Sequence, residues 1–372
     1  MGSAVGYSLG VDLGNTYVAA AVDRGSEVEM CTLGESSLVM PAVVHIAEGG
    51  TTTVGDPAMR RGLAHPDRLV RGLRRRLGDR TPLLIGGHPY EVPDLLAVLL
   101  RTVLAKVTEQ QGAPPERVVL ARPASWDPDR CAAFDSVARL AGIDDARTVS
   151  EPEAVTAQYA ASRELAEGRV LGVYDLGGGT FEVSLVRRLA GGVEIVGRPQ
   201  GIERLGGLDF DEALVDLVDG SLGGRLRQVK PDDPGAARFL ARLRVQCEQA
   251  KEALSADDTV EIPVSIGAEQ FDARITRADL EHVIGVPVRS TVQAVEAALR
   301  SAGMSAGELD GLLLVGGSSR IPLVSRTIAE AFGCPVRTNV SAKNLVALGA
   351  AAAEGRTASA PSDARRPTPR VP

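Results

Sequence analysis

The sequence predicts an α/β protein built from two related halves, and three observations support this prediction. Strand-like apolar segments alternate with helical segments along the chain. The 372 residues exceed what one ordinary core holds and suit two domains. The segments LGVDLGNTYVAAAV (9–22) and VYDLGGGTFEVSLV (173–186) share one pattern, in which apolar residues enclose Asp-Leu-Gly, a small polar turn, Thr and an aromatic residue. We interpret the pair as a duplicated hairpin.

The two copies can be aligned residue by residue, although the second copy is one residue longer. A glycine break between two apolar runs is by itself typical of a plain β-hairpin turn. Because the whole pattern is repeated, we favour an internal duplication. The equivalent pairs are Asp12 with Asp175, Gly14 with Gly177, Thr16 with Thr180 and Tyr17 with Phe181.

The first half is expected to begin with the hairpin, at 7–22, followed by strands at 27–47 and a strand at 117–124. A helix should come next, with Asp127 as its cap and Pro128 at its first position. The apolar face of this helix is expected to hold Ala133, Phe134, Val137 and Leu140.

Ser150 and Glu153 have the spacing of a capping box, which places Glu151 in the first turn of the following helix. The second half then starts at about residue 171 with the second hairpin. We expect a division into a first lobe, 1–170, and a second lobe, 171–354. The later elements should be a strand-like segment in 193–210, a helix at 234–254, a strand pair at 258–275, a helix at 277–302, a buried strand before Gly316, a helix from Pro322 and a final helix near 344–354.

The composition indicates a globular protein that does not act on nucleic acids. Apolar residues make up 44% and charged residues 24%, and the net charge is −7, whereas nucleic-acid binders are usually basic. No apolar run reaches the roughly 18 to 20 residues of a membrane span. The four cysteines form no C-x-x-C pair, so we expect no zinc site and a cytoplasmic location. The segment 355–372 is expected to be a disordered tail or linker.

Glycines follow four of the strand-like segments, and these breaks are candidates for anion binding. Backbone N–H groups in such turns form concave anion sites. Asp12 and Asp175 lie at equivalent strand ends, and two carboxylates so placed suit a hydrated Mg²⁺ ion. Neither the P-loop pattern nor the G-x-G-x-x-G pattern occurs in the chain. The glycines concerned are Gly14, 177–179, 206–207 and 316–317.

Several motifs, in order along residues 6–354, carry a resemblance to a known family. GVDLGNTY and VYDLGGGTFEVS are similar to its two phosphate motifs, and LVGGSSRIP is similar to its adenosine motif. The passages ARPASWDPDR, SEPEAVTAQYA, LGGLDFD and CEQAKEALS also match. The chain thus resembles the nucleotide-binding domain of the 70-kDa heat-shock chaperones, within the actin-like ATPase superfamily. This resemblance implies two lobes, each built on a duplicated ribonuclease-H-like core, with a central nucleotide cleft.

The resemblance also implies a role for each matching residue. Asp12 and Asp175 would hold the hydrated Mg²⁺ and orient the attacking water, and Glu151 would lie beside that water. The implied catalytic residues are Asp12, Arg74, Glu151, Asp175 and Thr180. The implied ATP- and ADP-binding residues are Gly14, Asn15, Thr16, Tyr17, Gly177, Gly178, Gly179, Thr180, Gly206, Gly207, Glu248, Lys251, Ser255, Gly316, Gly317, Ser318 and Arg320.

Six positions depart from the family pattern. Arg74 stands where the family has a lysine that reaches the γ-phosphate and its water. An arginine is longer, planar and always charged, so it can bind phosphate well and yet position water poorly. The departures therefore bear on hydrolysis more than on binding. They are Asn15, Arg74, Glu182, Leu208, Glu252 and Lys343.

Plain structural interpretations exist for several of these residues. Asp12 and Asp175 could simply cap turns, and Glu248 and Lys251 could form an ordinary surface ion pair. Arg74 belongs to a basic run that could be a solvated helix face.

The expected function is that of a chaperone-related domain that binds ATP with Mg²⁺, hydrolyses it slowly, and opens and closes its cleft. The alternative is a nucleotide-sensing regulatory or interaction module with little hydrolysis. A kinase or filament-forming relative is a third hypothesis, which lacks a dedicated substrate base. The family's peptide-binding domain and its apolar linker do not occur in this sequence. Besides nucleotide, the resemblance implies a co-chaperone or nucleotide-exchange protein as partner, and we expect a monomer.

Overall fold

The computed structural model describes residues 6–161, 165–228, 234–266, 269–338 and 344–353. Two features considered from the sequence, the departure at Lys343 and the tail at 355–372, lie outside the described residues.

The first of two large sheets is built around the first hairpin. Its strands run in the order β11-β10-β1-β2-β3, and the short β4 also pairs with β2. The pairs β1–β10 and β10–β11 are parallel, while β1–β2 and β2–β3 are antiparallel. These strands are β1 (Ser8–Leu13), β2 (Tyr17–Asp23), β3 (Val28–Met30), β4 (Met40–Pro41), β10 (Arg117–Arg122) and β11 (Ala146–Ser150).

The second large sheet repeats this arrangement around the second hairpin. Its order is β14-β13-β12-β17-β18, with β12–β17 and β17–β18 parallel and β12–β13 and β13–β14 antiparallel. Order and direction therefore match the first sheet strand by strand, which confirms the predicted duplication. The strands are β12 (Val170–Leu176), β13 (Thr180–Leu189), β14 (Gly192–Glu203), β17 (Leu309–Val315) and β18 (Val336–Thr338).

Three smaller sheets extend the two halves. The first comprises β5 (Val44–Ile46), β6 (Thr52–Val54) and β7 (Leu69–Val70), and the second comprises β8 (Leu83–Ile85) and β9 (His88–Tyr90). In the other half, β15 (Thr259–Ile266) and β16 (Glu269–Thr276) form the strand pair expected at 258–275.

Nine α-helices lie within the described residues. Short 3₁₀ turns accompany them, of which η2 (Arg74–Arg76) and η5 (Gly317–Arg320) border the site described below. The helices are α1 (Gly55–Ala64), α2 (Val92–Gln111), α3 (Pro128–Leu140), α4 (Glu151–Ala161), α5 (Gly207–Ser221), α6 (Pro234–Ala253), α7 (Arg277–Ala302), α8 (Pro322–Phe332) and α9 (Leu345–Ala352).

Local sequence signals explain where two of these helices begin. The Asp127 carboxylate accepts a hydrogen bond from the backbone N–H of Arg130 (2.8 Å), as expected for the cap of α3. The Ser150 N–H and hydroxyl donate to Glu153, and the Glu153 N–H donates back to the Ser150 hydroxyl, so the predicted capping box is confirmed. Leu140, expected on the apolar face of α3, is the last residue of the helix and is 43% exposed, so this face does not stay buried to the end of the helix.

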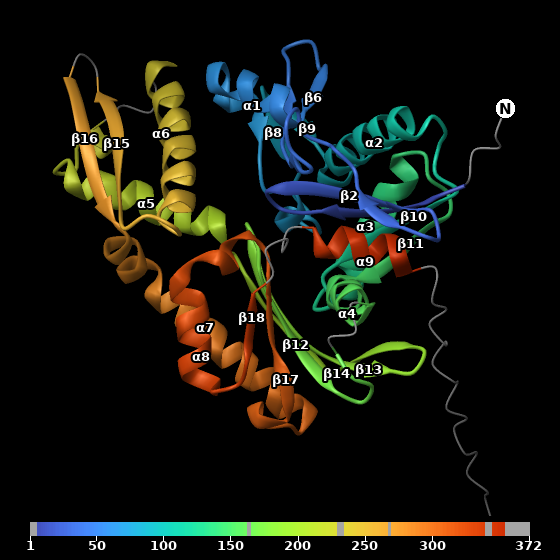
Figure 1. Cartoon of the computed structure of the whole chain (residues 1–372). Helices are drawn as coiled ribbons and strands as arrows, with labels where there is room; N and C mark the ends of the chain where they lie inside the picture. Colours follow the sequence, from blue (N-terminus) through green and yellow to red (C-terminus); the bar gives the residue numbers. More distant parts are fainter. Residues whose placement is uncertain (1–5, 162–164, 229–233, 267–268, 339–343, 354–372) are drawn as a thin grey trace, which may run out of the picture.

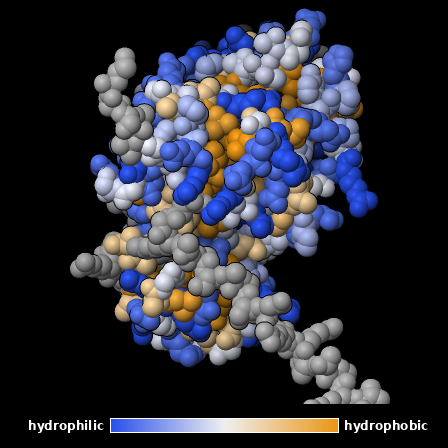
Figure 2. All heavy atoms as spheres, turned by 90° about the vertical axis from the view of Figure 1, so that its right-hand side faces the viewer, coloured by the Kyte–Doolittle hydropathy of each residue, from blue (hydrophilic) through white to orange (hydrophobic). Residues whose placement is uncertain are grey.

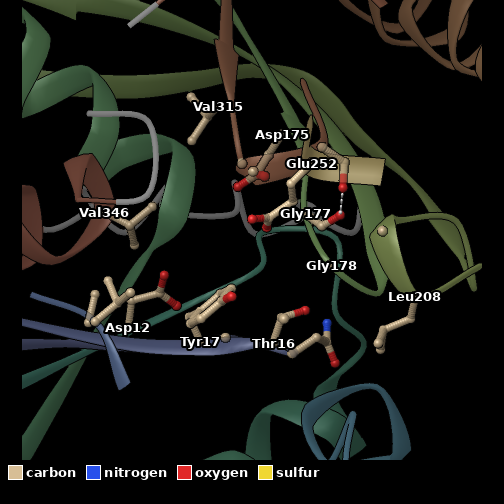
Figure 3. A pocket seen from close by; sticks show the side chains of 18 of the residues that line it. Asp12, Thr16, Tyr17, Asp175, Gly177, Gly178, Leu208, Glu252, Val315 and Val346 are labelled. Atoms are coloured by element: carbon tan, nitrogen blue, oxygen red, sulfur yellow. Dashed lines mark hydrogen bonds between the residues drawn. The ribbon is translucent and has the colours of Figure 1, made fainter. Parts of the chain in front are cut away.

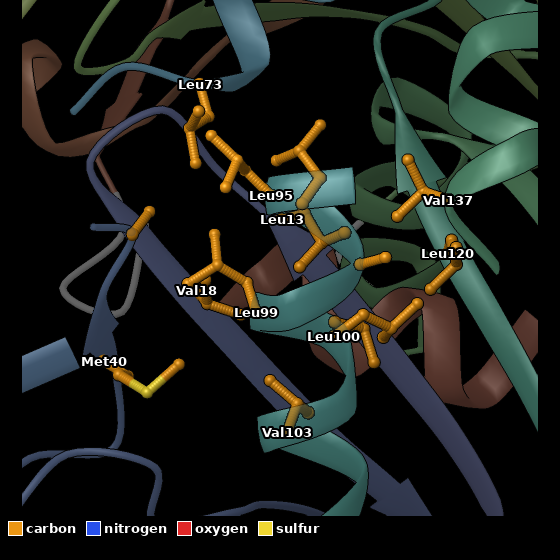
Figure 4. Packing of buried hydrophobic residues seen from close by; sticks show 14 of the residues in the cluster. Leu13, Val18, Met40, Leu73, Leu95, Leu99, Leu100, Val103, Leu120 and Val137 are labelled. Atoms are coloured by element: carbon orange, nitrogen blue, oxygen red, sulfur yellow. The ribbon is translucent and has the colours of Figure 1, made fainter. Parts of the chain in front are cut away.

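The core of the first lobe forms where α2 packs on the first hairpin (Figure 4). Leu95, Leu99 and Val103 follow one face of α2 and meet Leu13 and Val18 from the two strands, all of them fully or almost fully buried. This packing fixes both strands, and with them the turn between them, which borders the site.

Two helices, α4 and α9, lie between the two large sheets (Figure 1). Small residues allow a close approach: a Cβ at Gly349 of α9 would overlap the Ala154 carbonyl of α4, and one at Gly10 of β1 would overlap the backbone at Ala351. The chain thus returns to the first sheet after completing the second. The lobe boundary at 170/171 stays a prediction.

Hydrophilic side chains predominate on the face shown in Figure 2, with apolar side chains visible between them. Among the described residues, no helix is both long and apolar enough to cross a membrane.

Candidate active site

A cleft of about 940 Å³, part of it open to solvent, lies where the turns of the two hairpins meet (Figure 3). One wall comes from the β1–β2 turn and η2, and the other from the β12–β13 turn, α5, α6 and η5. Because both hairpins belong to rigid sheets, the residues at their turns are held at fixed positions around this space.

Most of the residues expected in the site line this cleft. Those that do are Asp12, Gly14, Asn15, Thr16, Tyr17, Arg74, Glu151, Asp175, Gly177, Gly178, Gly207, Glu248, Lys251, Ser255, Gly316, Gly317 and Ser318. Gly179, Thr180, Gly206 and Arg320 are not among the lining residues. Gly179 is covered by the first turn, Thr180 starts β13, Gly206 packs behind the second turn, and Arg320 is exposed at the end of η5.

Where the two turns touch, the first turn contributes side chains and the second turn contributes glycines. A Cβ on Gly178 would overlap the Thr16 hydroxyl, and a Cβ on Gly179 would lie 2.8 Å from the Asn15 carboxamide carbon. The glycines of the second turn therefore make room for the side chains of the first.

Neighbouring segments of the second lobe hold the second turn. The Gly177 carbonyl accepts hydrogen bonds from the Gly207 N–H (3.1 Å) and the Ser318 hydroxyl (2.9 Å), and the Gly178 carbonyl accepts one from the Leu208 N–H (2.7 Å). Gly316, with φ of +81°, lies so close to Asp175 that a Cβ would come within 2.5 Å of the carboxylate. Only glycine fits there, for reasons of both space and conformation.

Three carboxylates and one guanidinium meet at the inner end of the cleft. Asp12 and Asp175 occupy equivalent positions near the ends of β1 and β12, and Glu151 begins α4. Arg74 Nη1 contacts a Glu151 carboxylate oxygen and lies 3.5 Å from Asp12 Oδ1. Arg74 and Glu151 are only 8% and 6% exposed, so these charges interact with little screening.

Burial and mutual repulsion shift the pKa values of this cluster. Burial, with the Glu151 charge, raises the pKa of Asp12 to about 7 although Arg74 lowers it. Burial raises the pKa of Asp175 well above its ordinary value, and the charges of Glu151 and Asp12 add to the effect. Burial lowers the pKa of Arg74, but Glu151 and Asp12 more than compensate and hold it above its ordinary value.

The cluster fits a hydrated divalent cation. Asp12 Oδ1 is buried and accepts no hydrogen bond from any described residue, and three carboxylates face a single guanidinium. The described residues contain no group of three or more acidic, His or Cys side chains that could bind a metal directly. An ion such as Mg²⁺, which keeps most of its waters, suits this arrangement better than one that needs a full protein cage.

On β13, Glu182 lies opposite Asp175 of β12, and its carboxylate reaches the first lobe. Its carboxylate accepts hydrogen bonds from the N–H groups of Ala124 (3.1 Å) and Ser125 (2.8 Å) and from the Ser125 hydroxyl. Burial raises the pKa of Glu182, with a further contribution from the Glu151 charge. The longer glutamate thus connects the second sheet to the loop before α3.

Beside the second turn, α6 presents Lys251, a buried cation with two polar partners. Lys251 Nζ lies 2.6 Å from Asp211 Oδ1 and donates to the Gly207 carbonyl (3.0 Å). Asp211 also lines the cleft, and sequence reasoning did not name it as a site residue. Its place in LGGLDFD, four residues after Gly207 and thus one helical turn further along, was the available signal.

The remaining lining residues that were not anticipated are mostly apolar. Val346 brings α9 into the cleft and Ile321 follows η5, so the apolar wall comes from segments far apart in sequence. The set comprises Ala19, Val39, Val315, Ile321 and Val346, and Leu208 and Glu252, noted above as departures, line the cleft as well.

Charged pairs join the lobes across the mouth of the cleft. Arg71 lies 3.8 Å from Glu248 of α6, and Arg75 lies 3.3 Å from Asp209 of α5. The Arg75 N–H also donates to Asn15 Oδ1 (2.7 Å), which ties η2 to the first turn.

Comparison with protein families agrees with this geometry. A family model described as "Hsp70 protein" matches residues 8–83 and 83–359, which includes both hairpins and every residue of the cleft. The fold is the two-lobed actin-like ATPase fold, with two related sheets and a cleft between them. The chain belongs to the Hsp70 protein family.

Proposed function

We propose that this chain binds ATP and ADP together with Mg²⁺ in the cleft and hydrolyses ATP slowly, with lobes that open and close. The observation that carries the proposal is the carboxylate cluster at the point where the two glycine-containing turns meet. Family membership supports an ATP-binding chaperone domain in general, and the cluster supports the more specific reaction.

Each part of the cleft has a task in this proposal. The turns around Gly14 and Gly178 would bind the phosphates through backbone N–H groups, and Lys251 and Ser255 would meet the ribose and base. Asp12 and Asp175 would hold a hydrated Mg²⁺, which supplies charge neutralisation for the phosphates. Phosphoryl transfer depends mainly on such positioning and on electrostatic stabilisation.

Water positioning would fall to the buried carboxylates. Glu151 lies against Arg74 rather than free in the cleft, so its remaining acceptor capacity would orient the attacking water. Because the guanidinium is paired with Glu151, it is poorly placed to orient water itself. This arrangement supports slow hydrolysis.

Single-turnover hydrolysis tests the reaction. Wild type should hydrolyse bound ATP in a Mg²⁺-dependent manner, and Asp175→Asn should slow this step by about 100-fold or more. Asp272→Asn, an exposed carboxylate on β16, is the matched control and should behave as wild type. If Mg²⁺ makes no difference to wild type, the ATPase proposal is wrong. If calorimetry finds ATP and ADP binding weaker than about 1 mM, the nucleotide proposal fails as well.

A nucleotide-sensing module with little hydrolysis is the second candidate. The specific observation in its favour is the same engagement of Arg74 by Glu151 and Asp12. In this function, binding of nucleotide would be signalled by closure of the lobes, and hydrolysis would not be required. Arg74→Lys discriminates between the two: faster hydrolysis identifies Arg74 as the limiting departure, and an unchanged or lower rate shows that this view of Arg74 is wrong.

Further proposals concern partners and location. From the family we propose a co-chaperone or nucleotide-exchange protein as partner, which would release nucleotide by separating the lobes and so break the two cross-cleft pairs. We propose a monomer in the cytoplasm, a compartment that suits the four free cysteines. Size-exclusion chromatography with light scattering, and fractionation of cells, would test these two points.

A further inference from the structure

Arg74 reaches the cleft from the turn η2, which is anchored in the core of the first lobe. Its neighbours Leu73 and Leu77 are completely or almost completely buried, which fixes the turn η2 in the core of the first lobe. The hydrogen bond from the Arg75 N–H to Asn15 then ties the same turn to the first hairpin. The guanidinium therefore reaches the carboxylate cluster from a backbone that cannot easily move away.

Within the cluster, Arg74 lies against one of the two carboxylate oxygens of Asp12. The same atom, Nη1, contacts Glu151 and lies 3.5 Å from Asp12 Oδ1. This carboxylate oxygen is buried and has no hydrogen-bond partner among the described residues, so the ion pair is its main compensation. A cation that approaches Asp12 through this oxygen must therefore replace Arg74 there or share the oxygen with it.

Arginine suits such a role better than lysine. A guanidinium stays protonated, and it carries five N–H donors, so it can serve two carboxylates at once. Glu151 can keep Arg74 in the cleft even when the weaker, 3.5 Å contact to Asp12 is lost.

We propose that Arg74 is a tethered counter-ion that competes with Mg²⁺ for Asp12 and so raises the Mg²⁺ concentration that tight nucleotide binding requires. The inference rests on the proposed function of the cleft and adds a control to it. At low Mg²⁺ the guanidinium occupies Asp12, and nucleotide is held weakly. At high Mg²⁺ the ion takes Asp12, and Arg74 remains paired with Glu151.

The competition must be distinguished from the general effect of removing a positive charge near a cation. Arg74→Met removes the charge, but leaves Glu151 buried and unpaired. The double variant Arg74→Met/Glu151→Gln removes one positive and one negative charge, so the net charge of the cluster is the same as in wild type. It also replaces both buried partners together, which is far less disruptive than breaking the pair.

The experiment is calorimetric titration of ADP into the full chain at a series of Mg²⁺ concentrations, with EDTA as the metal-free limit. The half-saturating Mg²⁺ concentration for the gain in ADP affinity should fall at least about tenfold in Arg74→Met and about threefold or more in the double variant. Arg76→Met is the matched control, because Arg76 is in the same turn but pairs with Asp79 outside the cleft, and it should match wild type.

Binding of Mn²⁺ alone, followed by electron paramagnetic resonance without nucleotide, gives a second readout. Mn²⁺ affinity should increase from wild type to the double variant to Arg74→Met.

The double variant decides the question if Arg74→Met does not fold. A half-saturating concentration in the double variant equal to or above that of wild type overturns the proposal, since net charge alone would then account for any effect. A wild type that binds ADP equally with and without Mg²⁺, or not at all, instead rejects the proposed function.

Discussion

The two hairpin turns that meet in the cleft have the same origin but different surfaces. The β1–β2 turn presents Asn15 and Thr16, whereas the β12–β13 turn presents the glycines 177–179. The strands on either side keep equivalent order and direction, and an aspartate stands near the end of the first strand in both. Only the turns have diverged, and they have become complementary, with side chains in one and space in the other.

This difference shows how two copies of a duplicated hairpin can pack against each other. Two identical side-chain-bearing turns would collide, and two glycine turns would leave a gap. In the observed pairing, Thr16 lies against Gly178 and Asn15 lies against Gly179. The comparison therefore predicts that small changes at these contacts have unequal effects in the two hairpins.

The largest effect is expected for Gly178→Ala. The added methyl group would overlap the Thr16 hydroxyl, so the two turns could not approach as closely as they do in the structure. Because forcing an extra methyl group into a filled contact typically costs about 1 to 3 kcal/mol, ADP affinity should fall by roughly tenfold to 100-fold. Calorimetry on the variant measures it.

A second-site change tests the cause. Thr16→Ala in the Gly178→Ala background removes the overlapping hydroxyl and should restore part of the affinity. If the double variant binds no better than Gly178→Ala, the contact between the turns is not the reason for the loss.

The next effect concerns Asp211, which supports the second turn through Lys251 and Gly207. Burial raises the pKa of Asp211 from 3.8 to about 6, although Lys251 lowers it. Between these values the folded state binds more protons than the unfolded state, so this carboxyl makes the free energy of unfolding fall as pH rises from about 4 to 6. By about pH 7 this loss of unfolding free energy is nearly complete, at roughly 2 to 3 kcal/mol.

Denaturant unfolding of wild type and Asp211→Asn at about pH 4.5, 5.5 and 7 measures this contribution to the free energy of unfolding. As the pH rises, the free energy of unfolding of wild type should fall relative to that of Asp211→Asn. Asp216→Asn, an exposed position on the same helix, should track wild type. Parallel profiles for wild type and Asp211→Asn would contradict the prediction.

Local patterns gave the duplicated hairpins, the α3 cap and the Ser150–Glu153 capping box, because each depends on residues close in sequence. The contact of Arg74 with Glu151, far along the chain, could not be predicted, because it depends on how η2 packs beside α4. Leu140 followed the helical period but is the last residue of α3, where the neighbouring core ends. The entry of α9 into the cleft likewise follows from tertiary packing that no local signal specifies.

A smaller effect is expected for Asn15→Ala. Asn15 Oδ1 accepts the hydrogen bond from the Arg75 N–H, so the variant should lose about 1 kcal/mol of unfolding free energy. Asn15→Asp keeps an acceptor at the same place and should lose less. Equal losses in denaturant unfolding would show that the hydrogen bond is not what this side chain contributes.

The smallest effect is expected at the mouth of the cleft, where Arg75 and Asp209 form a pair with side chains 28% and 31% exposed. A double-mutant cycle with Arg75→Ala and Asp209→Ala isolates their interaction, which should be about 0.5 kcal/mol because solvent screens such pairs. If the pair forms only when the two turns meet, the coupling should be measurable in ADP affinity at low salt and disappear at about 1 M salt. The same coupling in the Gly178→Ala background should be close to zero, because turns that cannot meet would keep the two charges apart. If it persists there, the pair closes the mouth of the cleft independently of the hairpin contact.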